Sequence, residues 1–302
     1  MKKYFFILLS VFLLGCEGKK PLVYEGWSMT MPYKIVIADK LSSSQMQNVL
    51  SILSFTLDEI NQTYNNWNSE SEVSQFNKQI SSYPISKKLQ KLIKITTNAY
   101  ELSCGRFDPT VGPVSMAFHK AYLEDKPMQI KNSLSIGWEY VHLNGNVLLK
   151  DKEDISLDFC GIAKGYCLDL IIERLSDIGI KNALVEWSGE IRVIGKKEDT
   201  PWSVQIDSNL PPISLKDAAI ATSGSQYNQI NSKDAICHVI DPKTKKPMPV
   251  ISSIKKVSVK APTCAIADAL ATAAMTFDNM EEAKTWAKEI TEKQPNITFW
   301  FF

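Results

Sequence analysis

The sequence predicts an α+β fold, and three observations lead to that prediction. Helical and strand-like patterns occur in groups instead of alternating one by one, which argues against a doubly wound parallel sheet. With 302 residues, 44% of them hydrophobic, the chain can bury a sizeable core. Neither a low-complexity linker nor an internal repeat divides it. We therefore expect one compact unit with mixed or antiparallel sheets and flanking helices.

Apolar spacing assigns the elements of the first half of the chain. Tyr33–Ile37 follows strand composition, and apolar residues recur at helical spacing over Ser44–Asn61. The other elements predicted here are a short helical turn over Ser71–Asn77, an amphipathic helix over Lys87–Leu102 stopped by Cys104 and Gly105, a meander over Val141–Leu157 turning at Asn144, Gly145 and Asn146, and a helix over Gly161–Ile178 ended by Gly179.

Short strands are predicted for most of the second half. They are expected over Ala183–Glu186, Ile191–Ile194, Ser203–Ile206, Ala219–Thr222, Ile236–Ile240 and Ile254–Lys260. Two helices follow over Thr263–Phe277 and Met280–Thr291, and a closing strand is expected over Ile297–Phe302.

The first residues resemble a bacterial lipoprotein signal. Lys2 and Lys3 precede an apolar stretch from Tyr4 to Leu14, which is shorter than the about 20 residues needed to span a bilayer. Cys16 follows directly after Gly15. The resemblance implies a signal peptide over residues 1–15, an acylated Cys16 with a tether over residues 16–24, and a domain over residues 25–302. The protein would then be lipid-anchored in the cell envelope, on the extracytoplasmic (periplasmic) side. The alternative is an ordinary signal peptide with a coincidental cysteine.

Charge and cysteine content give no indication of nucleic-acid binding, of a disulfide framework or of a zinc site. A net charge of +1 without a basic stripe gives no reason to expect nucleic acid. Past Cys16, five cysteines without a C-x-x-C pair indicate neither a disulfide framework nor a zinc site. The spacing of Cys160 and Cys167 would allow a disulfide, but we favour small buried thiols.

The run Ala261–Thr272 carries the most specific chemistry. Pro262 and Thr263 are typical of a helix start, and Asp268 and Thr272 then share one helix face, four residues apart. A carboxylate among alanines needs a cation or a donor if it is buried, and two hard oxygens suit Mg²⁺. The alternative is a surface Asp and a Thr that bonds back into its own helix.

Three further segments are candidates for a site. In Asp158–Tyr166, an apolar strand leads into a glycine-containing helix start with Lys164, which favours an anion but also fits a plain turn. Phe107–Pro113 contains two turns, at Asp-Pro-Thr and Gly-Pro, and predicts either a shaped site loop or a structural corner. His238 ends a strand before an Asp-Pro turn, and a lone His is more often structural than catalytic.

In this order, the segments resemble the motifs of the ApbE family, the Mg²⁺-dependent FAD:protein FMN transferases. The matching patterns are F-D-P-T-V-G-P, D-x-x-G-I-A-K-G-Y, T-S-G, H-x-I-D-P-x-T and A-P-T-C-x-x-A-D-A-L-A-T, found at Phe107–Pro113, Asp158–Tyr166, Thr222–Gly224, His238–Thr244 and Ala261–Thr272. The resemblance implies a single compact, T-fold-related α+β domain. It also implies transfer of the FMN part of FAD to a Thr hydroxyl of an acceptor protein, with release of AMP.

The same resemblance implies roles for individual residues. Asp268 and Thr272 would bind Mg²⁺ with their side chains, and Gly161 with its backbone carbonyl. Asp268, Thr272, Lys164 and His238 are the implied catalytic residues. FAD contacts carry over to Met29, Tyr64, Arg106, Phe107, Asp108, Asp158, Lys164 and His238, with Phe107 and Tyr64 packing on an aromatic ring.

The implied acceptor is a flavin-carrying subunit of a membrane redox complex, of the Na⁺-translocating NADH:quinone reductase type or a relative. The alternatives to flavin transfer are an FAD pyrophosphatase that releases FMN and AMP, and a non-catalytic lipid-anchored flavin-binding protein. Three departures from the family pattern accompany the match: Ser188 stands where the family has Gly before Gly-Glu, Lys245 replaces the Gly after Asp-Pro-x-Thr, and the loop Thr222–Tyr227 is one residue longer.

Overall fold

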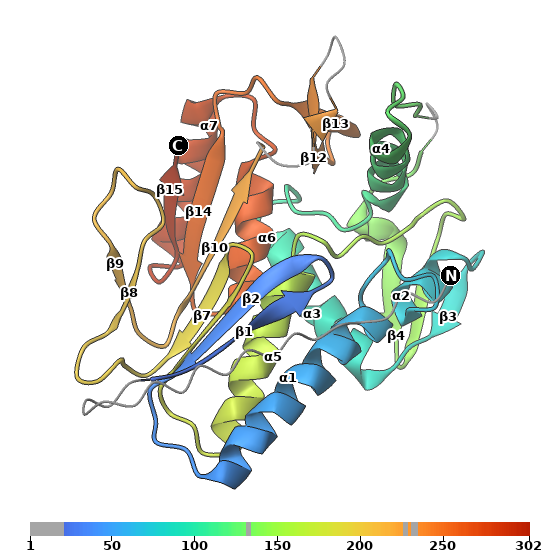
Figure 1. The fold of residues 1–302 in the computed structure, drawn as a ribbon. Coiled ribbons are helices and arrows are strands. Elements are labelled where there is room, and N and C mark those ends of the chain that lie inside the picture. Colours follow the sequence, from blue (N-terminus) through green and yellow to red (C-terminus); the bar gives the residue numbers. More distant parts are fainter. Residues whose placement is uncertain (1–20, 131–133, 226–228, 231–234) are drawn as a thin grey trace.

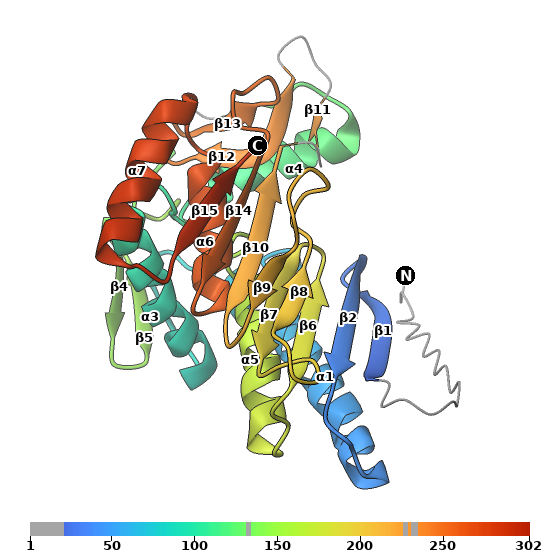
Figure 2. The ribbon, with the colours of Figure 1, turned by 90° about the vertical axis from the view of Figure 1, so that its left-hand side faces the viewer.

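The computed structural model describes residues 21–130, 134–225, 229–230 and 235–302. A seven-stranded antiparallel sheet in the order β1-β2-β6-β7-β10-β14-β15 forms its centre (Figures 1 and 2). Its strands are β1 (Leu22–Ser28), β2 (Met31–Ile37), β6 (Ala183–Trp187), β7 (Glu190–Ile194), β10 (Ala219–Gly224), β14 (Lys256–Ala261) and β15 (Thr298–Phe301). The predicted α+β class with antiparallel sheets is therefore confirmed.

Smaller sheets surround this centre. Two of them have three strands, in the orders β11-β12-β13 and β3-β5-β4, and the third is a ribbon of β8 and β9. Their strands are β3 (Ser82–Pro84), β4 (Val141–Asn144), β5 (Val147–Lys150), β8 (Trp202–Val204), β9 (Ile213–Leu215), β11 (Gln229–Ile230), β12 (Ile236–Asp241) and β13 (Lys246–Pro249).

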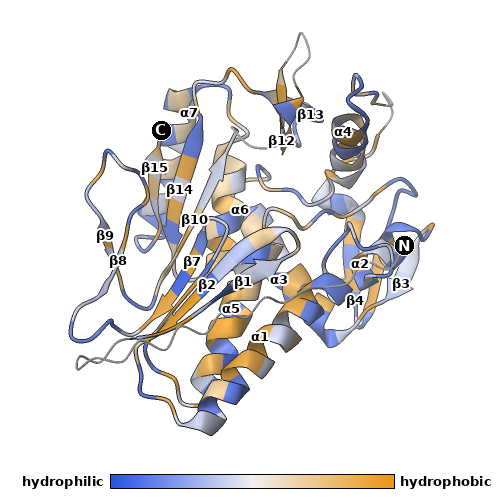
Figure 3. Ribbon diagram, viewed as in Figure 1, coloured by the Kyte–Doolittle hydropathy of each residue, from blue (hydrophilic) through white to orange (hydrophobic). Residues whose placement is uncertain are grey.

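Helices cover one face of the central sheet, and the β8–β9 ribbon crosses the other (Figure 2). The helices are α1 (Ser43–Thr63), α2 (Glu72–Asn77), α3 (Lys87–Leu102), α4 (Gly112–Glu124), α5 (Ala163–Asp177), α6 (Cys264–Ala274) and α7 (Met280–Lys293), with a 3₁₀ turn over Trp138–Tyr140. Apolar residues are concentrated along α1 and α5, where these helices face the sheet (Figure 3). No helix in the described ranges is long and apolar enough to cross a membrane.

Two apolar clusters follow from this layering. The main core lies between the sheet and α1, α3, α5 and α6, and it includes the fully buried Trp187 and Phe159. A smaller cluster under the β8–β9 ribbon contains Trp202, Leu215 and Ile220. The second cluster explains why β10 is buried on both faces.

The structure corrects four predictions about local structure. Residues 22–24, assigned to the tether, pair in β1. Gly112 and Pro113 begin α4 instead of forming a second turn, because Pro is tolerated in the first helical turn. The meander ends at Lys150, since the segment up to Leu157 bonds to the side chain of Asn77 instead of to a strand. Cys160 is exposed and not a buried thiol. The proposed signal peptide and Cys16 lie outside the described residues.

Candidate active site

The candidate site lies where the N-terminal ends of α5 and α6 cross. A Cβ atom added at Gly165 would lie 2.2 Å from the carbonyl oxygen of Cys264, so the two backbones approach too closely for any side chain at this position. The small residues of α6 permit the same approach from the other side, because eight of its eleven residues are alanine, cysteine or threonine. The alanine-rich motif therefore serves to bring two helix ends into contact.

A buried cluster of three charged side chains occupies this crossing. Lys164 Nζ lies 2.8 Å from Glu190 Oε2, and the Glu190 side chain is only 2% exposed. Burial raises the pKa of Glu190 and of Asp268, and the Lys164 ammonium only partly offsets that effect. Burial alone would lower the pKa of Lys164, but the two carboxylates raise it. Two acids thus share one cation, so the cluster favours an additional positive charge.

Asp268 and the start of α5 leave oxygen atoms available at the crossing. The Gly165 N–H donates to Asp268 Oδ2 at 3.0 Å, whereas a regular helical turn would direct it to the Gly161 carbonyl. Within the described ranges, the Gly161 carbonyl and Asp268 Oδ1 accept no hydrogen bond. A Cβ atom added at Gly161 would lie 2.9 Å from Thr272 Oγ1, so Thr272 faces the same point.

These atoms form an oxygen-only donor set of one carboxylate, one hydroxyl and one carbonyl. Oxygen ligands suit Mg²⁺, which keeps several waters, and they do not suit zinc. In the described part of the chain, no three His, Cys, Asp or Glu side chains are arranged so that they could hold a metal ion by themselves. The structure therefore places Gly161, Asp268 and Thr272 together at one junction, with donors that fit the metal.

The Phe107–Pro113 loop is held by its own side chains. Asp108 Oδ1 accepts the Thr110 N–H at 2.8 Å, and Oδ2 accepts the Trp138 N–H at 3.1 Å. Burial raises the pKa of Asp108, although these hydrogen bonds oppose it. Phe107 is buried beside Gly161. Asp108 therefore shapes the loop that borders the metal donors.

Arg106 is also engaged with protein groups. Its guanidinium lies 3.8 Å from the ring centroid of Phe277, and Nη1 donates to the Thr276 carbonyl at 2.9 Å. Asp241 Oδ1 is 3.8 Å away from the same nitrogen. Arg106 thus connects the loop to the C-terminal end of α6 and to the end of β12.

Asp158 joins the α5 start to α4. Its Oδ1 accepts the Cys160 N–H at 2.8 Å, and its Oδ2 accepts a hydrogen bond from the Ser115 hydroxyl. Its backbone N–H donates to the Pro109 carbonyl at 2.7 Å. The two predicted motif loops are therefore fastened to each other through Asp158.

Tyr64, expected to pack on a ligand ring, contacts another aromatic side chain of the protein. Tyr64 is 1% exposed and lies edge-on to Tyr166 in the core, because it closes the C-terminal end of α1. Trp67, three residues later, is 41% exposed, donates to Cys160 Sγ at 3.2 Å and packs against His119. Trp67 is an exposed aromatic side chain next to the Asp158–Tyr166 motif, and sequence reasoning missed it.

Met29 and His238 belong to other elements of the fold. Met29 is in the tight turn between β1 and β2, where it has a positive φ of 48°, and its sulfur lies 4.0 Å from Asn65 Nδ2. His238 is exposed on β12. Neither is part of the charged cluster.

Two side chains of the site were missed by the role assignments. Glu190, the partner of Lys164, stands in the Ser188-Gly189-Glu190 segment, which was noticed only as a departure from the family pattern. Ser223, whose hydroxyl lies 3.4 Å from Thr272 Oγ1, belongs to the T-S-G motif. The signal for both was their position inside motifs that had no assigned chemistry.

The other departures have structural explanations. Ser188 has φ 50° and Lys245 has φ 58°, both in the left-handed region that favours glycine. Both turns are therefore retained without the family glycine, and Lys245 Nζ donates to the Leu134 carbonyl at 3.0 Å. Gln226 and Tyr227 of the longer loop lie outside the described residues.

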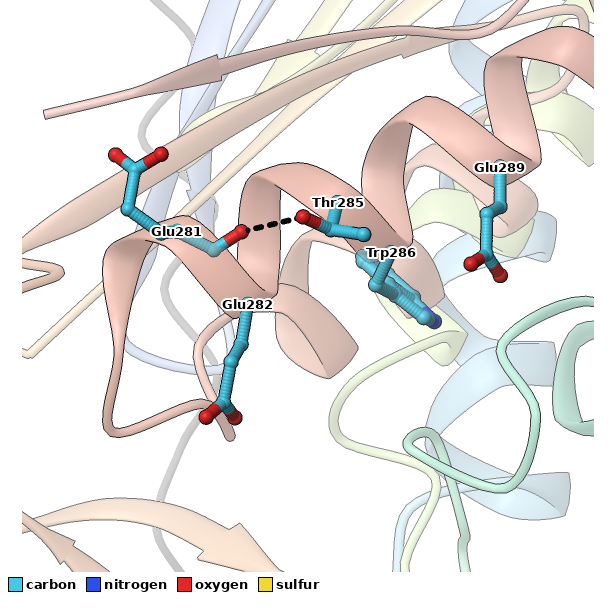
Figure 4. Close-up of a pocket in the computed structure, with 5 residues that line it drawn as sticks. All are labelled: Glu281, Glu282, Thr285, Trp286 and Glu289. Atoms are coloured by element: carbon cyan, nitrogen blue, oxygen red, sulfur yellow. Dashed lines mark hydrogen bonds between the residues drawn. The ribbon is translucent and has the colours of Figure 1, made fainter.

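A surface hollow lies elsewhere, on α7. It is lined by Glu281, Glu282, Thr285, Trp286 and Glu289, and the three carboxylates point outward (Figure 4). The Thr285 hydroxyl donates to the Glu281 carbonyl of its own helix. None of its five lining residues is a Lys or Arg or belongs to a motif, so it is not the candidate site.

Comparisons with known proteins show which family the whole chain resembles. The ApbE family profile matches residues 29–298. The FAD:protein FMN transferase of Chlamydia pneumoniae is 34% identical over 300 residues, covering 96% of this chain and 95% of that protein. The FAD:protein FMN transferase of Vibrio cholerae is 30% identical over 298 residues, with 91% and 87% covered.

Solved structures show the same fold. The flavin transferase ApbE from Vibrio cholerae has a TM-score of 0.74 at 26% identity, covering 93% of each chain. The apo flavinyl transferase ApbE of Pseudomonas stutzeri has a TM-score of 0.80 at 22% identity, covering 93% of this chain and 90% of that one.

Proposed function

The chain belongs to the ApbE family, and on that premise we propose that it is a FAD:protein FMN transferase. The finer proposal is that Mg²⁺ supports transfer of FMN to a Thr hydroxyl of an acceptor protein. The new bond joins the Thr oxygen to the FMN phosphorus, and the bond from that phosphorus to the bridging oxygen breaks. AMP leaves with the bridging oxygen, and the hydroxyl proton is released.

The observation that carries the proposal is the under-neutralised cluster at the α5–α6 crossing. Gly161, Asp268 and Thr272 offer oxygen ligands around a point beside the Lys164 ammonium. When bound there, Mg²⁺ would neutralise charge on the diphosphate and on the leaving AMP. Lys164, held by Glu190, provides a second, fixed positive charge for a phosphate oxygen. Phosphoryl transfer needs little more than this positioning and charge.

Incubation of the purified protein with FAD, Mg²⁺ and a candidate acceptor tests this proposal. We expect a fluorescent acceptor band in a denaturing gel and a mass increase equal to FMN minus water on one Thr. Free FMN and AMP without modified acceptor would favour the pyrophosphatase alternative. Tight FAD binding without any turnover would favour a flavin-binding protein.

We also propose that Cys16 carries a lipid anchor that holds the enzyme on the extracytoplasmic face of a membrane, where its acceptor is a flavoprotein subunit of a membrane redox complex. The support is the Gly15-Cys16 pair directly after an apolar stretch. Labelled palmitate should appear in the unsubstituted protein and be lost in Cys16→Ser.

A further inference from the structure

Helix α6, which carries two of the three proposed metal ligands, is not capped by its own residues. Thr263 occupies the N-cap position, but its side chain makes no capping hydrogen bond. The first two N–H groups of the helix, those of Cys264 and Ala265, donate instead to Asp169 Oδ1 and Oδ2 at 2.8 and 2.9 Å. Asp169 belongs to α5, so a carboxylate of the neighbouring helix accepts the N–H groups that an N-cap side chain normally accepts.

Helix α5 has the reverse arrangement. Ile162 at its N-cap position has no side-chain acceptor, and the N–H of Gly165 in the first turn donates to Asp268 Oδ2 of α6. Each helix therefore caps the other. The two α5 residues involved, Gly165 and Asp169, are one turn apart, as are Ala265 and Asp268 on α6.

Two side chains of strand β7 contact the residues of α5 at this reciprocal cap. Arg192 Nε lies 3.1 Å from Asp169 Oδ1, and Arg192 Nη1 donates to the Val193 carbonyl at 2.8 Å. Glu190, two residues earlier on the same strand, pairs with Lys164. Because side chains alternate along a strand, Glu190 and Arg192 point to the same face, which is the face that α5 covers.

We propose that Asp169 is a positioning residue for the metal site. Its carboxylate fixes α6 along α5, so that Asp268 and Thr272 face the Gly161 carbonyl before any ligand binds. This inference rests on the proposed Mg²⁺ site. Because both Asp169 carboxylate oxygens accept backbone N–H groups of α6, its removal would act on metal affinity through the position of that helix. Loss of a residue that supports a metal ligand typically lowers affinity about 10- to 100-fold.

Asp169→Ala and Asp39→Ala form a matched pair for the test. Asp39 Oδ2 also accepts two backbone N–H groups, those of Lys181 and Asn182 at 2.7 and 2.8 Å, but none of these residues is part of the candidate site. Calorimetric titration of Mg²⁺ into the purified full-length protein, with and without FAD, measures the dissociation constant. Thermal unfolding of the metal-free variants reports the structural cost of each substitution.

We expect Asp169→Ala to weaken Mg²⁺ binding about 10- to 100-fold and Asp39→Ala to leave it unchanged, although both variants unfold at lower temperature. The transfer rate of Asp169→Ala should recover at saturating Mg²⁺, so the KM for Mg²⁺ changes and kcat does not. Asp169→Asn keeps one acceptor and should fall between, which preserves the test if the alanine variant does not fold.

Equal Mg²⁺ affinity in Asp169→Ala and the unsubstituted protein would overturn the inference, and so would an unsubstituted protein that binds no Mg²⁺. If the protein binds Mg²⁺ but transfers no FMN, the proposed function fails while the titration still decides the role of Asp169.

Discussion

Helix α5 carries a buried ionic cluster near each end, and the two clusters differ in how completely they are paired. Toward the C-terminal end, Glu59 Oε2 lies 2.8 Å from Arg174 Nη2 and 2.9 Å from Lys88 Nζ. Arg174 Nη1 also donates to Thr56 Oγ1 at 2.6 Å. Here two cations share one carboxylate, and every partner comes from the protein.

At the N-terminal end the balance is reversed. Lys164 faces two buried carboxylates, Glu190 and Asp268, and the Lys164 side chain remains 27% exposed. The Gly161 carbonyl and Asp268 Oδ1 have no donor within the described ranges, whereas Asp268 Oδ2 accepts the Gly165 N–H. A saturated cluster holds three helices together, whereas an unsaturated cluster among motif residues marks a place for a ligand. Burial alone does not distinguish them; completeness of pairing does.

The strongest test of the unsaturated cluster is Asp268→Asn. The amide keeps the shape and an acceptor for the Gly165 N–H but removes the charge that binds a cation. We expect FMN transfer to fall by about 10²–10³-fold, with the free energy of unfolding changed by no more than about 1 kcal/mol. Rate measurements across a Mg²⁺ series and chemical denaturation of the same samples check both parts. A large loss of stability would show that Asp268 is structural, like Glu59.

Lys164→Met separates charge from packing in the same cluster. It removes the ammonium that pairs with Glu190, so we expect a transfer rate about 10²-fold lower and a stability loss of about 3 kcal/mol from the unpaired carboxylate. The double variant Lys164→Met/Glu190→Gln should regain most of the stability and none of the rate. Denaturation curves and initial rates of both variants decide this. Recovery of activity in the double variant would remove Lys164 from the proposed mechanism.

Glu59→Gln applies the same change to the saturated cluster. Arg174 and Lys88 then lose their shared carboxylate, and we expect a stability loss of about 3 kcal/mol. The KM for FAD, the KM for Mg²⁺ and kcat should stay within about twofold of the unsubstituted values when measured well below the unfolding temperature. A selective rise in either KM would show that the two ends of α5 are coupled and that the Glu59 cluster is not purely structural.

Much of the fold could be predicted because local patterns determine it. The helical period assigned Lys87–Leu102 with the bounds that the structure shows, and the Asn144-Gly145-Asn146 turn predicted the β4–β5 hairpin. The prediction of a strand ending at Leu157 was wrong. The backbone of Leu157 bonds to the Asn77 side chain, 80 residues away, instead of to a strand. No local pattern reports such a partner.

The site residues also fall into two groups, those that the sequence predicts and those that only the structure identifies. Asp268 and Thr272 were predictable from helical spacing, and Lys164 and Gly161 from the motif match. Glu190 and Asp169 were not, because their contacts are made across long stretches of chain, as in the pairing of Asp169 with Cys264 over 95 residues. Sequence pattern thus identified the residues proposed to touch the ligand, and only the structure identified those that hold them.

Lys88→Met should have the smallest effect of the substitutions considered. Lys88 is half exposed, and Glu59 keeps Arg174, the less exposed of its two cations, after the substitution. Because exposed partners of an ion pair contribute little, we expect a stability change below about 1 kcal/mol and unchanged transfer kinetics. Comparison of its denaturation midpoint with that of Glu59→Gln gives the measurement. A loss as large as that of Glu59→Gln would mean that the Glu59 carboxylate needs both cations. The two ends of α5 would then differ only in the Gly161 carbonyl and Asp268 Oδ1, which accept no hydrogen bond from the part of the chain that the structure describes.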